Sequence, residues 1–127
     1  IAALLRKKGY EVVDYGTYSE ESCDYSDFGH ALGSAIDNGD VDLGVAFCGS
    51  GNGISMTLNK HQKVRAALCW GTELARLAKA HNNANVLVMP ARFISYQMAT
   101  TILNKWLTTE FEGGRHERRI EKIPLCK

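Results

Sequence analysis

Three apolar runs alternate with segments of helical periodicity, and this alternation limits the possible folds more than any other feature of the sequence. The runs are VDLGVAFCG, VRAALCW and NVLVMP, at residues 41–49, 64–70 and 85–90. A nearly continuous apolar run is typical of a strand that is buried on both faces. Strands that alternate with helices predict a parallel sheet covered by helices on both faces, which is the α/β class.

The intervals between these runs carry apolar residues at helical spacing. We expect helices over residues 25–38, 53–60, 94–108 and 115–122, and a further helix that Thr72 caps.

The first part of the chain departs from this pattern. Residues 11–16, EVVDYG, form a short β-rich run that predicts a strand, whereas residues 1–8 resemble the second half of a helix. A doubly wound domain normally opens with a strand. We therefore expect an opening strand, and the turn after it, to be missing from this numbering.

Length and composition predict a single soluble globular domain over residues 1–127. Hydrophobic residues make up 45% of the chain and charged residues 23%, so a hydrophobic core can form. The formal net charge of +1 gives no reason to expect nucleic acid or an anionic membrane as a partner. No apolar run approaches the roughly 20 residues of a membrane span, and no signal peptide is visible.

The four cysteines are scattered, at Cys23, Cys48, Cys69 and Cys126. None forms a CxxC pair, which argues against a zinc ribbon. Scattered cysteines in a domain with a good core are typical of free thiols in a reducing compartment, so we expect a cytoplasmic protein. No other group of histidines, cysteines and carboxylates has metal-ligand spacing, so we expect no metal.

A glycine-rich stretch, AFCGSGNGISM, follows the first apolar run at residues 46–56. Gly49, Gly51 and Gly53 would let backbone N–H groups point at an anion where a strand ends and a helix begins. The stretch lacks the Lys-Ser or Lys-Thr of a Walker A motif, and Ile54 stands where GxGxxG needs its third glycine. Composition alone fits an anion site and a tight strand-to-helix turn equally well.

Cys48 precedes these glycines at the expected end of a strand. A thiol near the N-terminus of a helix loses its proton readily and becomes a better base or nucleophile. The alternative is a buried cysteine that packs as a small hydrophobic residue. Cys69 ends the next expected strand and fits either role, whereas Cys23 and Cys126 have no neighbours that suggest a function.

Four ordered motifs together resemble the ribose-5-phosphate isomerase B family. They are CGSGNGISMTLNK, KVRAALCW, KAHNNANVLVMPAR and EGGRHERRIEKI, and the resemblance extends from GYEVVDYGTYS to the end of the chain. The family also contains allose-6-phosphate isomerase and the galactose-6-phosphate isomerase subunits. Membership implies a Rossmann-like three-layer α/β/α sandwich without a dinucleotide. It also implies aldose–ketose isomerisation without metal or cofactor, and a homodimer, or a tetramer, with shared active sites.

The resemblance assigns roles to the glycine-rich stretch. Cys48 corresponds to the catalytic base of the family. The loop that holds the enediolate corresponds to Gly49, Ser50, Gly51, Asn52 and Gly53. The family usually has CGTGIG here, so Ser50 replaces threonine and keeps its hydroxyl, while Asn52 replaces isoleucine and is expected to alter sugar selectivity.

The same resemblance assigns His81 and Asn82, which precede the third apolar run. His81 corresponds to the residue that donates a proton to the ring oxygen of the sugar, and Asn82 to a residue that hydrogen-bonds the substrate. Without the resemblance, a loop histidine is more typical of a solvated side chain. Histidine suits proton transfer because its reference pKa of about 6.5 is close to working pH. His30, His61 and His116 have weaker claims.

Arg115 and Arg119 are four residues apart, so on a helix they project from one face and could form a phosphate clamp. Charge pattern alone favours a solvated face, since Glu117 and Glu121 are interspersed. In the family pattern, Arg92 joins these arginines as a substrate-binding residue, and Tyr25 lines the sugar pocket. Arg118 is expected to point elsewhere.

These observations predict an isomerase that interconverts ribose 5-phosphate and ribulose 5-phosphate through an enediolate. The alternatives are an isomerase of a six-carbon sugar phosphate, such as allose or galactose 6-phosphate, and a non-catalytic sugar-phosphate sensor. The family also has an acidic residue and a histidine at the end of its opening strand, and this sequence contains neither at a matching position.

Overall fold

The computed structural model describes residues 1–16 and 24–125. Along the chain, the elements are α1 (Ala2–Lys7), α2 (Tyr25–Asp37), β1 (Gly44–Cys48), α3 (Asn52–Leu58), β2 (Ala66–Leu68), α4 (Thr72–Asn82), β3 (Val86–Pro90), α5 (Tyr96–Thr108) and α6 (Arg115–Glu121).

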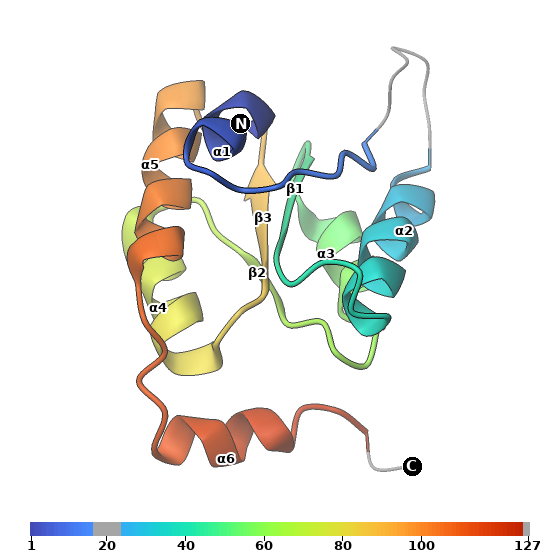
Figure 1. The fold of residues 1–127 in the computed structure, drawn as a ribbon, viewed down its shortest axis with the longest axis vertical. Helices are drawn as coiled ribbons and strands as arrows, with labels where there is room; N and C mark the ends of the chain where they lie inside the picture. The colour runs from blue at the N-terminus through green and yellow to red at the C-terminus, as the bar shows by residue number, and fades with distance from the viewer. Residues whose placement is uncertain (17–23, 126–127) are drawn as a thin grey trace.

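The strands form one parallel sheet in the order β1-β3-β2. Gly44 pairs with Val86 at one end of the sheet, and Cys48 pairs with Pro90 at the other. Helices α4 and α5 cover one face, and α2 and α3 cover the opposite face, while α6 lies beyond the amino ends of the strands (Figure 1). The predicted α/β/α sandwich with a parallel sheet is therefore confirmed.

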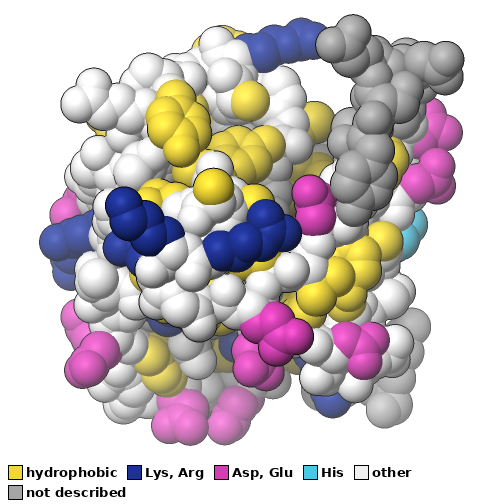
Figure 2. Space-filling view, turned by 45° about the horizontal axis from the view of Figure 1, so that its top comes forward, with side chains coloured by type: hydrophobic (Ala, Val, Ile, Leu, Met, Phe, Trp, Pro, Cys, Tyr) yellow, Lys and Arg dark blue, Asp and Glu magenta, His cyan; other side chains and the backbone are white. Residues whose placement is uncertain are grey.

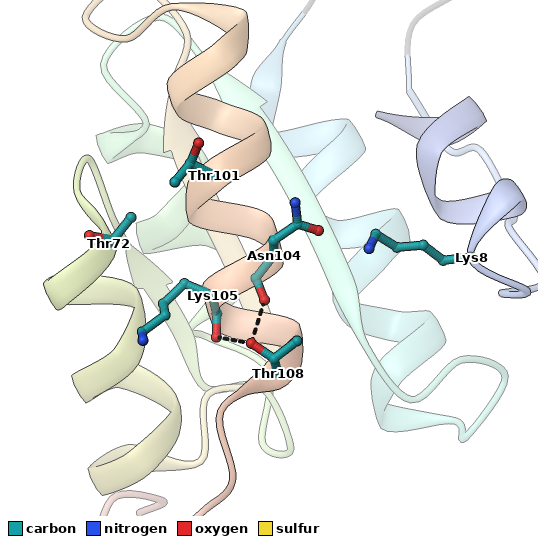
Figure 3. Close-up of a pocket in the computed structure, with 6 residues that line it drawn as sticks. All are labelled: Lys8, Thr72, Thr101, Asn104, Lys105 and Thr108. Carbon is teal, nitrogen blue, oxygen red and sulfur yellow. Dashed lines mark hydrogen bonds between the residues drawn. The ribbon is translucent and has the colours of Figure 1, made fainter.

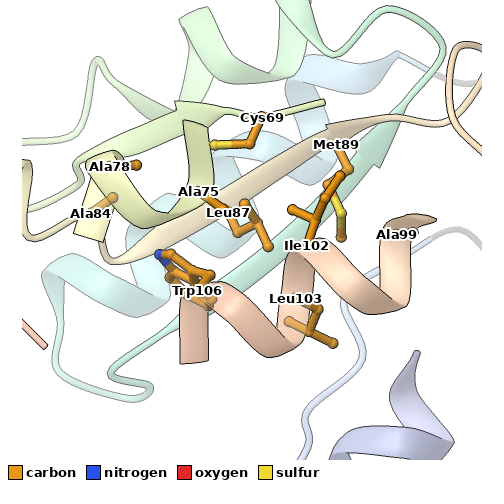
Figure 4. Packing of buried hydrophobic residues seen from close by; sticks show 10 residues of the cluster. All are labelled: Cys69, Ala75, Ala78, Ala84, Leu87, Met89, Ala99, Ile102, Leu103 and Trp106. Atoms are coloured by element: carbon orange, nitrogen blue, oxygen red, sulfur yellow. The ribbon is translucent and has the colours of Figure 1, made fainter. Parts of the chain in front are cut away.

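The central strand β3 explains why both faces are covered. Its five residues are all buried, and successive side chains of a strand point to opposite faces. Leu87 and Met89 pack against α4 and α5, whereas Val86 and Val88 pack against α2 and α3. Figure 4 shows the first of these clusters, in which the fully buried Trp106 of α5 lies beside Leu87.

Two local predictions are wrong. Residues 11–16 form no strand, because β-rich sequence becomes a strand only where a neighbouring strand supplies ladder hydrogen bonds, and the sheet of the described residues consists of β1, β3 and β2. Thr72 does not cap α4 but is its first residue, since the helix begins one position earlier than predicted, after Gly71. The start of α5 shows the cap geometry that α4 lacks, because the Ser95 hydroxyl accepts a 3.0 Å hydrogen bond from the Met98 N–H.

Within the part of the chain that the structure describes, no helix has the length and apolar character needed to cross a membrane.

Candidate active site

The glycine-rich loop leaves the sheet at Cys48 and enters α3 through Gly51. Gly51 has φ +82° and ψ −11°, which is the left-handed region, and it is the residue immediately before α3. A Cβ atom at this position would collide with Cδ1 of Leu68 and approach Cγ1 of Val88 to 3.3 Å. Both the backbone conformation and the space therefore require glycine here.

The segment after β3 is hydrogen-bonded to this loop. The Ala91 N–H donates to the Cys48 carbonyl at 2.9 Å, and the Arg92 N–H donates to the Gly49 carbonyl at 3.1 Å. The Arg92 side chain then lies along the loop, since a Cβ atom on Gly49 would be only 3.0 Å from Arg92 Nε. Strand pairing thus brings the Arg92 guanidinium group against Gly49, the residue that follows Cys48, whose free thiol is half-buried.

Tyr25 and Ser50 complete this group. A Cβ atom on Gly53 would be 2.5 Å from Cε1 and Cζ of Tyr25, so the tyrosine ring covers that glycine. The Ser50 hydroxyl accepts a long hydrogen bond of 3.3 Å from the Asn52 N–H, which leaves the hydroxyl hydrogen free to donate to a ligand. The thiol, the loop, Arg92 and Tyr25 form what we call the loop half-site.

The other predicted residues lie together elsewhere. His81 is in the last turn of α4, Asn82 is the final residue of that helix, and Arg115 and Arg119 are exposed on α6. The Glu112 N–H donates to the Ala80 carbonyl at 2.9 Å, which ties the segment before α6 to the end of α4. We call this group the helix half-site.

The two half-sites are at opposite ends of the sheet within one chain. Cys48 pairs with Pro90, the last residue of β3, whereas His81 precedes Val86, the first residue of that strand. Four steps along a strand cover roughly 13 Å at about 3.3 Å per residue. Groups separated by this distance cannot act together on one small ligand within one chain.

The helix half-site contains two residues to which sequence reasoning gave little or no weight. The His81 and His116 rings are stacked, with centroids 4.3 Å apart and planes 13° apart. Glu112 Oε1 lies 3.6 Å from Nε2 of His81 and 3.7 Å from Nε2 of His116. Burial, and then the charges of His81 and Arg115, lower the pKa of His116, while the Glu112 carboxylate acts in the opposite direction. The four-residue spacing of Glu112 and His116 in EGGRH was the available signal.

His81, Glu112 and His116 also form the one group among the described residues with ligand atoms close enough to suggest a metal. The ring geometry argues against this. A metal binds imidazole nitrogen in the plane of the ring, at about 2.0–2.1 Å for zinc. Two nearly parallel rings stacked 4.3 Å apart direct their lone pairs alongside one another rather than toward a common point.

The other described histidines, and Cys69, have structural environments. His30 Nδ1 lies 2.8 Å from His61 Nε2, and His61 Nδ1 lies 3.2 Å from Asp37 Oδ2, which joins α2 to the segment after α3. Cys69 is buried in the hydrophobic cluster beneath α4 and α5, and burial raises the pKa of its thiol to about 11. Of the two roles left open for Cys69, the structure supports packing. Cys23 and Cys126 lie outside the described residues.

The face that contains the strand ends is partly apolar. Phe47, Trp70 and Phe93 lie at or just beyond the carboxyl ends of β1, β2 and β3, and are 41%, 57% and 74% exposed. Tyr96, at the start of α5, is also exposed. Figure 2 shows hydrophobic side chains gathered around Lys and Arg side chains on the face turned forward.

A hollow of about 450 Å³ lies away from both half-sites. Figure 3 shows its lining, which comes from α5 and from single residues near α1 and α4, namely Lys8, Thr72, Thr101, Asn104, Lys105 and Thr108. The Thr108 hydroxyl already donates to the Asn104 carbonyl at 2.8 Å. None of the predicted site residues lines this hollow.

An α/β sandwich with a thiol, a glycine loop and an arginine at its strand ends is the architecture of an enzyme for small polar ligands. The sequence matches the Ribose/Galactose Isomerase family over residues 1–123, and the chain belongs to this family. It is 40% identical to ribose-5-phosphate isomerase B of Escherichia coli K12 over 123 residues, which are 97% of this chain and 83% of that protein.

Solved structures agree with this assignment. A ribose 5-phosphate isomerase from Thermotoga maritima matches with a TM-score of 0.92 and 48% identity, covering 96% of this chain and 84% of that one. Ribose-5-phosphate isomerase B from Mycoplasma genitalium, solved with bound ribulose-5-phosphate, matches with a TM-score of 0.92 and 41% identity. The match covers 97% of this chain and 82% of that one.

Proposed function

We propose that this chain is a cytoplasmic aldose–ketose isomerase whose single domain, residues 1–127, interconverts ribose 5-phosphate and ribulose 5-phosphate. The observation that carries the proposal is the loop half-site, in which the Cys48 thiol, the glycine loop and Arg92 meet at the end of the sheet. The relative from Mycoplasma genitalium, which binds ribulose-5-phosphate, supports this choice of substrate.

The chemistry follows from the residues of the two half-sites. Cys48, as thiolate, takes the proton from C2 of the open-chain aldose, and the electrons of that bond form the enediolate. The same proton is returned to C1. Meanwhile O2 loses its hydroxyl proton and O1 gains a proton, so that the carbonyl moves from C1 to C2. The Ser50 hydroxyl and loop N–H groups stabilise the enediolate oxygen, and the reaction needs no metal or cofactor.

We propose that each active site is built from two chains of a homodimer. His81, Asn82, Arg115 and Arg119 of one chain then face the loop half-site of its partner, because a single chain separates the two groups. The exposed Phe47, Trp70 and Phe93 around the loop support a second chain as the cover of this face. His81 would open the sugar ring, Asn82 would hydrogen-bond the sugar, and the arginines would bind the phosphate.

The function is tested with a substrate panel and a cysteine variant. Ribose 5-phosphate, allose 6-phosphate and galactose 6-phosphate are assayed, and turnover of ribose 5-phosphate is expected to be fastest. Cys48→Ala should abolish isomerisation and keep substrate binding within about tenfold, because a base acts on the chemical step. Cys69→Ala, which removes a thiol outside the site, should remain active. Near-normal turnover in Cys48→Ala would exclude the thiol as the base.

The two-chain site is tested by mixing variants. Arg119→Ala should raise KM by about 10-fold or more, as expected when a hydrogen bond to a charged group is lost, whereas the neighbouring Arg118→Ala serves as the charge-matched control. A heterodimer of Arg119→Ala and Cys48→Ala has one site with both changes and one with neither. An equal mixture with random exchange should therefore regain about one quarter of wild-type activity, whereas no recovery would contradict a shared site.

A further inference from the structure

Glu112 lies between two histidines of the helix half-site. Its Oε1 atom is 3.6 Å from Nε2 of His81 and 3.7 Å from Nε2 of His116. These distances are too long for hydrogen bonds in a neutral cluster but suit an ion pair that tightens when one imidazole is protonated. One carboxylate can compensate one positive charge, so the cluster is balanced when a single histidine carries a proton.

The two histidines are not equivalent. The side chain of His116 is 12% exposed, whereas that of His81 is 38% exposed and is the one that a substrate can reach. Burial lowers the pKa of His116, and the nearby charges of His81, Arg115 and Arg119 act in the same direction. Protonation of the inner ring is therefore disfavoured, and the outer ring is the one that is exposed to a ligand.

The backbone holds this arrangement independently of the side chains. The Glu112 N–H donates to the Ala80 carbonyl at 2.9 Å, and the His116 N–H donates to the Gly113 carbonyl at 3.2 Å. The stacked His116 ring, at 4.3 Å and 13°, limits rotation of the His81 ring from one side. An uncharged replacement for Glu112 would thus change the charge beside His81 without moving the segment.

We propose that Glu112 is a positioning residue for the ring-opening step: its carboxylate orients the His81 imidazole and pairs with it when it carries the proton. The inference rests on the proposed function of His81. In that step His81 gives a proton to the ring oxygen, and the bond from C1 to the ring oxygen breaks. The anomeric hydroxyl loses its proton to water, so C1 becomes the aldehyde carbon, and His81 regains a proton from solvent.

Ring opening can be separated experimentally from the base step. Ribose 5-phosphate is mostly cyclic, whereas ribulose 5-phosphate is open-chain because its C5 oxygen carries the phosphate. Exchange of a C1 proton of ribulose 5-phosphate for deuterium in D₂O therefore needs the enediolate chemistry of Cys48 but no ring opening. Isomerisation that starts from ribose 5-phosphate needs both steps.

The test compares Glu112→Gln with Glu110→Gln, which removes the same charge from an exposed neighbour in the same segment. Glu112→Gln should lower kcat on ribose 5-phosphate about tenfold or more, a part of the 10²–10⁴-fold effect of general acid catalysis. Its deuterium exchange on ribulose 5-phosphate should stay within about twofold of wild type. Glu110→Gln should change neither rate.

A double variant shows whether Glu112 acts through His81. In a His81→Ala background, Glu112→Gln should have almost no further effect, because the group that it orients is gone. The inference would be overturned if Glu112→Gln slowed isomerisation as much in the His81→Ala background as in the wild type. It would also be overturned if Glu112→Gln lowered isomerisation of ribose 5-phosphate and deuterium exchange on ribulose 5-phosphate equally. If His81→Ala slows turnover and Glu112→Gln does not, the inference fails and the proposed function stands. If His81→Ala has no effect on ribose 5-phosphate, the role of His81 and the inference both fail.

Discussion

Substitution of Gly51 tests the geometry of the loop half-site more directly than any other single change. Alanine at this position meets two separate obstacles. The backbone has φ +82°, which disfavours residues with a Cβ atom, and that atom would collide with Cδ1 of Leu68. Because Leu68 is the last residue of β2, relief would require movement of the sheet edge or of the loop.

The two costs can be estimated separately. The left-handed conformation costs about 1–2 kcal/mol, and the stiffer unfolded chain returns about 0.4–1 kcal/mol of this. Insertion of a methyl group into a packed region costs about 1–3 kcal/mol. Gly51→Ala should therefore lower the free energy of unfolding by about 2–4 kcal/mol, which is about 1–2 M in the urea midpoint for a slope of about 2 kcal/mol per M.

Two other glycines separate the contributions in urea unfolding. Gly39 has φ +78°, and no atom lies within 4 Å of the point that a Cβ would occupy, so Gly39→Ala should show the backbone cost alone, about 1 kcal/mol. Gly71 has φ −156° and equally open space, so Gly71→Ala should be nearly neutral. The double variant Gly51→Ala/Leu68→Ala should lose less stability than the sum of the losses of the two single variants, because Leu68→Ala removes the atom with which the new Cβ collides. A cost for Gly51→Ala no larger than that for Gly39→Ala would refute the steric argument.

Two further predictions concern the hydrophobic cluster beneath α4 and α5. The pKa of the Cys69 thiol is raised from its usual 9.0 to about 11, so the folded state holds the proton more tightly. The protonated thiol should contribute its full stability below pH 9, and this contribution should be lost as the pH rises toward 11. In urea unfolding, the free energy of unfolding of Cys69→Ala should therefore fall less over this pH range than that of the wild type. Trp106→Ala should cost about 3–5 kcal/mol in the same assay. Trp106→Phe should cost clearly less, because the indole N–H has no hydrogen-bond partner among the described residues. Equal losses would contradict this account.

The sheet and its covering helices could be predicted because their signals are local. The run at residues 85–90 is apolar at nearly every position, and it became the central strand, with both faces buried. The register followed from parallel pairing, which puts Cys48 and the residues after Pro90 at the same edge. The contact of Arg92 with the loop is thus a consequence of strand order, whereas the resemblance had grouped Arg92 with Arg115 and Arg119.

The failures concern features that depend on distant partners. Residues 11–16 have strand-forming composition, but composition does not provide a neighbour to pair with. The sequence marks Glu112 only by its four-residue spacing from His116, which does not point to His81. It gains its position beside His81 only because its N–H bonds the carbonyl of Ala80, far away along the chain in a different element. Thr72 fits a cap by residue type, yet the choice between it and Gly71 depends on where the preceding segment turns.

Differences in packing make the two half-sites suitable for separate experiments. Arg115 and Arg119 are exposed on α6, so their substitution removes little packing and should report on binding rather than folding. Gly51 is buried between β2 and β3, so its substitution should affect folding and catalysis together. If the helix half-site acts on a partner chain, an α6 variant should fold normally, fail alone, and regain function beside a chain whose α6 is intact. This combination is not expected from damage to the fold, because a misfolded chain could not supply its loop half-site to a partner.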